Sequence, residues 1–404
     1  MLSTKDYVDK INRVFKALDE TNIKILSVMN QKGPRNLLEV ARTLRIPAAT
    51  VHSRIKRLEA EQVLETCTNF RTSKIGLERV SVTVKTSPGK FDLANRALKI
   101  PGYWRMITRS LGDVSDLYSA HAHPAGQTPQ MTRFLDEMKQ LDMISGFNLT
   151  SLGDRIILFH DFRDYDLEQG AWRFPWTEWL QEFLKPYSSG SADGSDMDLS
   201  PPRYEMLGDS LDLVILRELE KNARIKFSEL SQPTGITLQA VKYRFGNLFK
   251  RRILHGFVVD IPRFPPELSE RVEARLDVPP DRLEELYAKT KRLPFVHCAS
   301  RVLGEPSLAI RARLPRSEVR NFLEMLSLLT RRRILSGFSY SLLDLSSMEW
   351  QPVPNTLYHH KTGWGYDAQA HLEQLRKLNQ EWASEEPAWD SSPPTVNGYS
   401  ELPE

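Results

Sequence analysis

Several features that mark other protein classes are scarce in this chain of 404 residues. It has only two cysteines, Cys67 and Cys298, which excludes a disulfide framework and a zinc site with four cysteine ligands. No run of 18 apolar residues occurs, so we expect no membrane span. The first residues lack the apolar core of a secretion signal, and no glycine-rich phosphate loop is present. We therefore expect a cytoplasmic chain of ordinary globular composition.

Histidine gives little support for catalytic or metal chemistry. His121 and His123 alternate on a predicted strand, with no third metal ligand nearby in the sequence. His297 and Cys298 are adjacent on another predicted strand, so their side chains point to opposite faces and do not form a nucleophile pair. We therefore expect no metal, no cofactor and no enzymatic activity.

The chain does contain an internal repeat. Matching residues recur 190 positions apart, without gaps, over about forty residues, as in Arg54 and Arg244 or Leu64 and Leu254. A second match relates residues 144–147 to 335–338. We interpret the chain as two copies of a unit of about 150 residues, separated by a divergent segment and followed by a tail.

The apolar spacing predicts three helices in the first part of each copy. In copy one they cover residues 22–31, 35–44 and 48–62. Two β-like segments follow, 63–68 and 74–84, joined by the polar turn 69–73. Three helices followed by a hairpin form a winged helix-turn-helix, so a wing is expected here.

The second part of each copy alternates strands and helices. In copy one the predicted elements are strand 79–86, helix 88–98, strands 103–110 and 116–122, helix 128–141 and strand 146–152. In copy two they are 271–278, 280–292, 295–302, 307–314, 316–332 and 337–345. The order βαββαβ is ferredoxin-like. We predict an α+β chain with two winged helix-turn-helix domains, each followed by a ferredoxin-like domain.

These patterns divide the chain into six segments. They are a first winged helix-turn-helix (1–75), a first βαββαβ domain (76–160), an aromatic connector with a flexible acidic linker (161–204), a second winged helix-turn-helix (205–262), a second βαββαβ domain (263–347) and an acidic, partly disordered extension (348–404). The connector concentrates Trp172, Trp176 and Trp179 with two phenylalanines. We expect it to pack on the first βαββαβ domain; a partner interface is the alternative.

A helix-turn-helix followed by βαββαβ resembles the Lrp/AsnC (feast/famine) family of prokaryotic transcription regulators. The resemblance rests on the helices of 22–64 and on the turns after the second strands. It implies RAM-type regulatory domains, double-stranded DNA as partner and a small-molecule effector. The effector residues implied are Gly112, Asp113, Asp116, Gly304 and Glu305. Family members usually carry one unit and dimerise, so a homodimer or an intramolecular pseudo-dimer is expected. The tandem arrangement looks archaeal.

In a helix-turn-helix the last helix lies in the major groove, with its N-terminal part on the base edges. The outward residues of that helix are candidate DNA contacts: Thr50, His52, Ser53, Arg54, Lys56 and Arg57 in copy one, and Thr237, Gln239, Lys242, Tyr243 and Arg244 in copy two. Arg251 and Arg252 suit phosphates, and the wing tip adds Arg71 and Lys74. No acidic residue lies three or four positions after Arg54, so we expect Arg54 to contact bases.

The net charge of +3 hides a strong asymmetry. Residues 1–75 hold 14 basic and 8 acidic side chains, and residues 211–262 hold 9 and 5. The connector region 161–212 holds 4 and 12, and the tail 348–404 holds 3 and 9. The basic regions coincide with the helix-turn-helices, as phosphate binding requires. The leading hypothesis is a sequence-specific DNA-binding regulator with two non-identical helix-turn-helices per chain.

Two alternatives stay open. Siroheme decarboxylases resemble the same architecture, so a tetrapyrrole enzyme is one, with His121 and His123 as its candidate site residues. The other is a winged-helix docking protein of the transcription machinery, with the aromatic connector as its interface.

Overall fold

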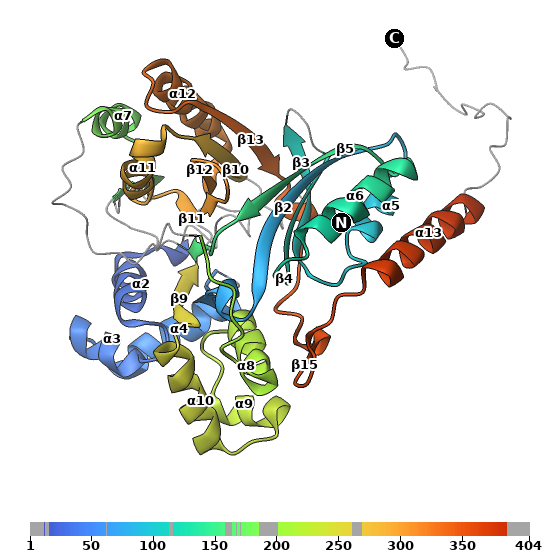
Figure 1. The fold of residues 1–404 in the computed structure, drawn as a ribbon. Coiled ribbons are helices and arrows are strands. Elements are labelled where there is room, and N and C mark those ends of the chain that lie inside the picture. The colour runs from blue at the N-terminus through green and yellow to red at the C-terminus, as the bar shows by residue number, and fades with distance from the viewer. Residues whose placement is uncertain are drawn as a thin grey trace, which may run out of the picture.

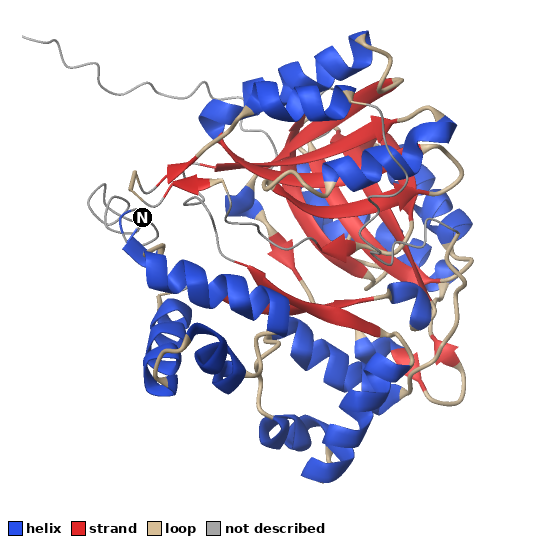
Figure 2. Cartoon of the chain, turned by 90° about the vertical axis from the view of Figure 1, so that its left-hand side faces the viewer, coloured by secondary structure: helices blue, strands red, loops and turns tan. Residues whose placement is uncertain are grey.

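The computed structural model describes residues 12, 16–61, 63–112, 116–157, 164–166, 168–169, 171–185, 201–260 and 269–385. The helix-turn-helix segments lie together at one end of the molecule, and a curved sheet with its covering helices forms the other end (Figure 1). A view turned by 90° shows the same separation (Figure 2). Within these residues no helix is long and apolar enough to cross a membrane.

Both predicted three-helix units are present. They consist of α2 (Glu20–Lys32), α3 (Leu37–Leu44) and α4 (Ala48–Ala60) in copy one, and of α8 (Ser210–Lys221), α9 (Phe227–Thr234) and α10 (Leu238–Lys250) in copy two. Asp19 caps the first helix of copy one by accepting a hydrogen bond from the Asn22 amide, and Asp209 caps the equivalent helix of copy two. The predicted inward residues Val51, Ile55 and Leu58 of copy one and Val241 and Leu248 of copy two are buried, whereas Phe245, the counterpart of Ile55, is only partly buried.

The predicted wing hairpin is wrong. β1 (Glu65–Phe70) pairs antiparallel with β9 (Leu254–Asp260) of the other copy, in a register that sets Glu65 opposite Asp260. The chain after β1 forms a short 3-10 turn and continues into β2 (Leu77–Thr86), which joins the large sheet. A single short strand leaves its backbone groups unpaired, and the equivalent strand of the second copy satisfies them. The two helix-turn-helices are thus joined by a shared β1–β9 ribbon.

Both βαββαβ units form as expected, with bounds within three residues of the predicted ones. Copy one contains β2, α5 (Phe91–Ala97), β3 (Trp104–Gly112), β4 (Leu117–Pro124), α6 (Thr128–Gln140) and β5 (Ile144–Leu152). Copy two contains β10 (Ser269–Asp277), α11 (Leu283–Thr290), β11 (Val296–Val302), β12 (Ser307–Pro315), α12 (Arg316–Arg331) and β13 (Gly337–Leu343). The strand orders, β5-β2-β4-β3 and β11-β12-β10-β13, are those of the ferredoxin-like unit. The α+β fold class is confirmed.

The two four-stranded sheets join at both edges. β13 pairs with β3 from Ser341 opposite Gly112 to Leu343 opposite Ser110, and β5 meets β11 at Leu152 and Val302. The backbones approach so closely at the first seam that a Cβ on Gly112 would lie 2.8 Å from the Tyr340 carbonyl oxygen. The strands therefore form one closed ring.

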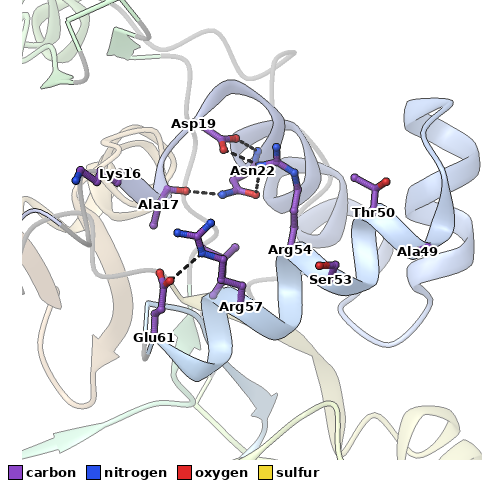
Figure 3. Close-up of a pocket in the computed structure, with 11 residues that line it drawn as sticks. Lys16, Ala17, Asp19, Asn22, Ala49, Thr50, Ser53, Arg54, Arg57 and Glu61 are labelled. Atoms are coloured by element: carbon purple, nitrogen blue, oxygen red, sulfur yellow. Dashed lines mark hydrogen bonds and ion pairs between the residues drawn. The ribbon is translucent and has the colours of Figure 1, made fainter.

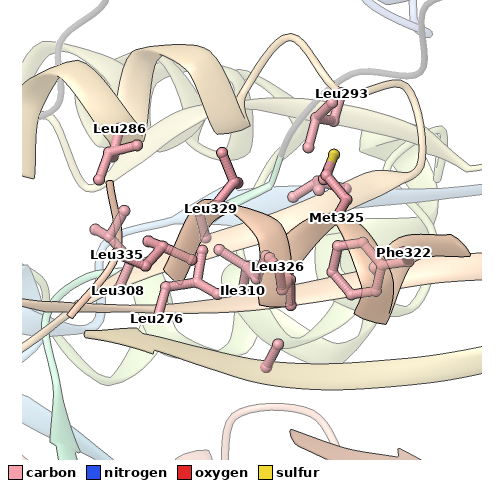
Figure 4. Close-up of a cluster of buried hydrophobic side chains, with 14 of the residues drawn as sticks. Leu276, Leu286, Leu293, Leu308, Ile310, Phe322, Met325, Leu326, Leu329 and Leu335 are labelled. Atoms are coloured by element: carbon pink, nitrogen blue, oxygen red, sulfur yellow. The ribbon is translucent and has the colours of Figure 1, made fainter. Parts of the chain in front are cut away.

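Strand alternation separates an apolar outer face from a polar inner face. Val272 and Leu276 of β10 belong to the same buried cluster as Phe322 of α12 in copy two. Figure 4 shows Leu276 and Phe322 in this cluster. Arg311 of β12 points the other way, donating through Nε to Glu273 at 2.6 Å and through Nη2 to the Tyr118 hydroxyl of copy one at 3.2 Å. Charged side chains thus lie between the two sheets.

The copies exchange their C-terminal helices. α7 (Trp176–Leu184) follows copy one but packs against copy two, where the Trp176 ring lies 5.3 Å from the Phe295 ring. α13 (Ala368–Glu385) follows copy two but buries Leu372 and Leu375 against α5 and α6 of copy one. Figure 1 shows each helix on the other copy's module. The expectation that the connector packs on the first module is therefore wrong, since α13 covers that surface.

Candidate nucleic-acid interface

The last helix of each helix-turn-helix exposes the face opposite its buried stripe. In copy one Thr50, His52, Ser53, Lys56 and Arg57 are exposed, and in copy two Thr237, Gln239, Lys242 and Tyr243 are exposed. Tyr243, a large aromatic residue, is 70% exposed. Thr237 also serves as the N-cap of α10, because its hydroxyl accepts a hydrogen bond from the Ala240 amide at 3.3 Å. These faces are free to meet a groove.

Arg54 and Arg244 have a different environment from the one expected. Arg54 Nη1 donates to Asp19 Oδ2 at 2.6 Å and to Asn22 Oδ1 at 3.0 Å (Figure 3). Arg244 Nη1 donates to Asp209 at 2.8 Å and to Asp212 Oδ1 at 2.9 Å. Each guanidinium thus holds the last helix of its unit to the N-terminus of the first helix.

Residue spacing within one helix does not reveal this contact, because the partner belongs to another helix. The acidic partner lies 35 residues earlier, at the helix cap, and both partners obey the 190-residue repeat. Although burial alone would raise it, hydrogen bonds from the Asp212 amide and from Arg244 hold the pKa of Asp209 below its usual value. The sequence signal for this ion pair was that an acidic residue at the helix cap and an arginine in the last helix both recur at the same repeat offset.

The candidate phosphate contacts fall into two groups. Lys56 and Lys242 form no hydrogen bond or ion pair with any described residue, so their charges are available. Arg57 donates to Glu61 at 2.8 Å, and Arg251 donates to the Leu207 carbonyl at 2.6 Å while keeping an exposed head. Backbone contacts need charge close to the groove rather than a fixed geometry, so all four fit the role.

Arg71 and Lys74 are not at a wing tip. The Arg71 amide donates to the Ile253 carbonyl of copy two at 2.9 Å, and Lys74 lies 3.6 Å from Glu205. Both side chains line a hollow of about 430 Å³ together with the exposed Arg252 and with Arg203. Arg71 and Lys74 therefore lie beside Arg252 of the second helix-turn-helix segment and not at a hairpin of the first.

The residues implied as effector contacts lie in and beside the turns after β3 and β11, with Asp113 outside the described residues. Asp116 Oδ2 accepts from the Thr86 hydroxyl at 2.9 Å, and in copy two the Ser307 hydroxyl donates to Asp277 at 2.7 Å. The acid and the hydroxyl have thus changed places between the copies while the hydrogen bond is kept. Glu305, beside Gly304, is engaged in an ion pair with Arg275.

The two alternating histidines are buried. His121 Nε2 lies 3.0 Å from the Ser119 hydroxyl, and burial, followed by the nearby His123, lowers the pKa of His121 to about 3. His123 Nδ1 lies 3.2 Å from Glu78, yet burial still lowers its pKa. Among the residues that the structure describes, no three His, Cys, Asp or Glu side chains gather as a metal site.

The comparisons with known proteins agree with this architecture. The AsnC-type helix-turn-helix domain model matches residues 18–59 and 209–248. An uncharacterized HTH-type transcriptional regulator of Pyrococcus abyssi is 36% identical over 107 residues, covering 26% of this chain and 68% of that protein. The HTH-type transcriptional regulator LrpA of Pyrococcus horikoshii is 32% identical over 88 residues, covering 22% of this chain and 62% of that protein.

A solved structure with the same arrangement is that of the siroheme decarboxylase NirDL. It aligns with a TM-score of 0.52 and 12% identity, over 89% of this chain and 98% of that one. At this identity the likeness establishes the fold alone. The resemblance predicted from the sequence is confirmed by the two matched helix-turn-helices and by the archaeal relatives. The chain belongs to the Lrp/AsnC family of transcription regulators and carries two AsnC-type helix-turn-helix units in tandem.

Proposed function

We propose that this chain is a sequence-specific DNA-binding transcription regulator that acts as a single-chain counterpart of a family dimer in the cytoplasm. The observation that carries the proposal is the β1–β9 ribbon, which joins two complete helix-turn-helices with exposed last helices. In a dimeric regulator two such units come from two chains and read two half-sites. Here one chain supplies both.

The recognition surfaces of the two units differ in chemistry. Gln239 is suited to adenine, whereas α4 offers Thr50 and Ser53 near its N-terminus. Lys56, Lys242 and the arginines at the ends of these helices supply phosphate contacts. Arg54 and Arg244 orient the helices through their cap contacts, which lowers their weight as base readers. Two different surfaces favour an asymmetric DNA site over a palindrome.

The alternatives receive less support. The hypothesis of a tetrapyrrole enzyme depended on His121 and His123 as site residues. His121 is hydrogen-bonded to Ser119, and His123 faces Glu78 and the Tyr366 ring. The docking protein depended on an available aromatic connector. Trp176 and Trp179 are instead packed on Phe295, and the Trp176 indole donates to Glu318 at 2.6 Å.

The test is selection of binding sites from random duplex DNA with the full chain, followed by fluorescence anisotropy on the selected site. We expect an asymmetric consensus. Gln239→Ala should relax the preference at one position in one half only, and each altered base pair there should cost about 1–3 kcal/mol in the wild type. Lys361→Ala, a change at an exposed lysine in the C-terminal extension, is the matched control. Failure to enrich any sequence, or a strict palindrome, would overturn the proposal.

A further inference from the structure

A cavity of about 760 Å³ lies where the β1–β9 ribbon and the end of α8 meet the large sheet. Cys67 and Val258 line it from the ribbon, and Lys221 from α8. Arg79 of β2 and Arg311 of β12 line it from the sheet. It is separate from the exposed faces of α4 and α10, and a molecule inside it touches both halves of the protein.

The lining carries more positive than negative charge. Five arginines and Lys221 face three acids, Glu59, Glu65 and Glu220. Partners outside the lining engage groups of both signs, because Glu59 is paired with Arg224, Lys221 with Glu218 and Arg311 with Glu273. Within the lining, Glu220 is paired with Arg105. Seven cations then stand against five carboxylates. The cavity therefore has an excess of cations over carboxylates.

Two of its arginines have no carboxylate partner among the described residues. Arg79 donates to the Gly153 carbonyl at 2.7 Å and to the Ser300 hydroxyl at 2.9 Å, and Arg155 has no hydrogen bond or ion pair there. Burial and, after it, the neighbouring Arg155 lower the pKa of Arg79 to about 10. An anion between these two guanidiniums would relieve both the desolvation and the repulsion.

Arg105 supplies a third, partly unused donor. Its Nη2 is paired with the buried Glu220, which also accepts from the Val353 amide at 3.0 Å. Its Nη1 is buried and has no hydrogen-bond partner among the residues that the structure describes. An unsatisfied buried donor of a charged group is costly, and a ligand carboxylate would satisfy it.

The rest of the lining combines apolar side chains with polar ones, namely Thr66, Thr68, Thr72, His121, Asn222 and His297. The apolar part includes Met106 of β3, Ala120 of β4 and Val258 of β9, together with Met348 and Trp350. Such surfaces accept an apolar framework, while separated cations fix its charged ends. We propose that this cavity binds an organic acid with at least two carboxylates on an apolar framework, and that the bound acid changes DNA affinity through the β1–β9 ribbon.

The coupling half of this proposal rests on the proposed function. Arg105 and Glu220 connect β3 of the sheet to α8, the first helix of the second helix-turn-helix. A carboxylate on Arg105 competes with or reinforces that contact. The β1–β9 ribbon lines one side of the cavity and connects the two helix-turn-helices. A ligand that binds one position of the ribbon more tightly than another therefore shifts the positions of both helix-turn-helices.

The test is isothermal titration calorimetry on the full chain without DNA. The two probes are naphthalene-2,6-dicarboxylate, a rigid aromatic dicarboxylate, and suberate, a flexible dicarboxylate, and they distinguish the two sources of this chemistry. Binding of either supports the proposal. Arg155→Gln should weaken binding about tenfold or more, since it removes one charged hydrogen bond without breaking an internal one. Arg320→Gln, on the exposed face of α12 and paired with Glu324 within the described part of the chain, is the control and should bind as the wild type does.

Binding of neither probe at millimolar concentration, or equal affinity in Arg155→Gln and wild type, would overturn the site. The second arm measures DNA affinity by anisotropy with and without the bound probe. We expect a change of about fivefold or more in the wild type and none in Arg155→Gln. Unaltered DNA affinity at saturation overturns the coupling. Because calorimetry needs no DNA, failure of the DNA-binding proposal leaves the site measurable.

Discussion

Replacing Arg244 by alanine should loosen the second helix-turn-helix before it affects any base contact. In the folded chain the guanidinium satisfies Asp209 and Asp212 at once. Removing it leaves two carboxylates close together, one of which, the Asp212 side chain, is only 7% exposed. The buried Asp212 charge then keeps a weaker counter-charge in Arg251, whose Nη1 lies 4.0 Å from its Oδ2. The weakly compensated buried charge and the like-charge pair both oppose the packing of α10 on α8.

The magnitude follows from the exposure of the groups. Breaking a fully buried ion pair from one side costs about 3–5 kcal/mol. Here the Arg244 side chain is 26% exposed and that of Asp209 is 53% exposed, so solvent screening reduces the cost to about 2 kcal/mol. In copy one, Arg54 and Asp19 are 34% and 46% exposed and the second partner is the neutral Asn22. Arg54→Ala should therefore cost about 1 kcal/mol or less.

Hydrogen exchange is the suitable assay because a chain with several domains does not unfold in two states. We expect amides of α10 to exchange roughly thirtyfold faster in Arg244→Ala, as about 2 kcal/mol implies, while α4 stays as in the wild type. A cycle with Asp209→Asn should show a coupling energy of about 0.5–3 kcal/mol. Unchanged protection of α10, together with a loss of DNA affinity confined to the specific site, would refute the reasoning and restore Arg244 as a base contact.

Three further predictions follow from the described contacts. Lys242→Ala should weaken specific and non-specific DNA binding alike and reduce the slope of log affinity against log salt by about 1, measured by anisotropy; a loss confined to the specific site would contradict a phosphate role. The pKa of His121 is lowered to about 3 in the folded chain, against about 6.5 when unfolded, so stability present above pH 6.5 falls by about 2 kcal/mol at pH 5. Thermal unfolding of His121→Gln should lose less on acidification than the wild type; an equal loss would show that other groups cause it. Gly112→Ala should lower thermal stability by about 1–3 kcal/mol, because the added Cβ meets the Tyr340 carbonyl at 2.8 Å; an unchanged melting temperature would show that the seam yields.

The sequence was sufficient where structure is decided locally. Apolar spacing in 48–62 and alternation in 79–86 marked the faces that the fold buries, and Val51, Ile55 and Val82 are fully buried. The outward set of the last helices followed from the same pattern. Local periodicity also placed the ends of the strands and helices of both βαββαβ units within three residues.

What the sequence left open are choices between equivalent partners. The strand after each last helix could turn back on its own copy or pair with the other, and nothing in 63–68 distinguishes the two. The same holds for α7, whose apolar face fits a βαββαβ unit but does not say which. Arg54 and Arg244 looked free because their acidic partners are distant in sequence. Each of these errors concerns a non-local pairing, and in a repeat protein every such pairing has two candidates.

The fusion of two copies allows contacts that a symmetric dimer excludes. In a twofold dimer every interface contact occurs twice, so both surfaces must complement themselves. Here Arg35 of copy one donates to the carbonyls of Ala223 and Ile225 in copy two, and its own repeat position in copy two is Ile225. No reciprocal contact can form.

The same holds for Arg224, which pairs with Glu59, since their repeat positions are Pro34 and Phe249. These one-way contacts lie between the helix-turn-helices, so each unit has specialised to face the other copy and not a second version of itself. A chain built from two first copies would place an arginine where Ile225 stands and a glutamate where Phe249 stands. It would lose the stacking of Arg35 on Phe227, whose centroid lies 4.4 Å from the guanidinium. An asymmetric pair of units, fixed in one order by such contacts, is what the proposed asymmetric DNA site requires.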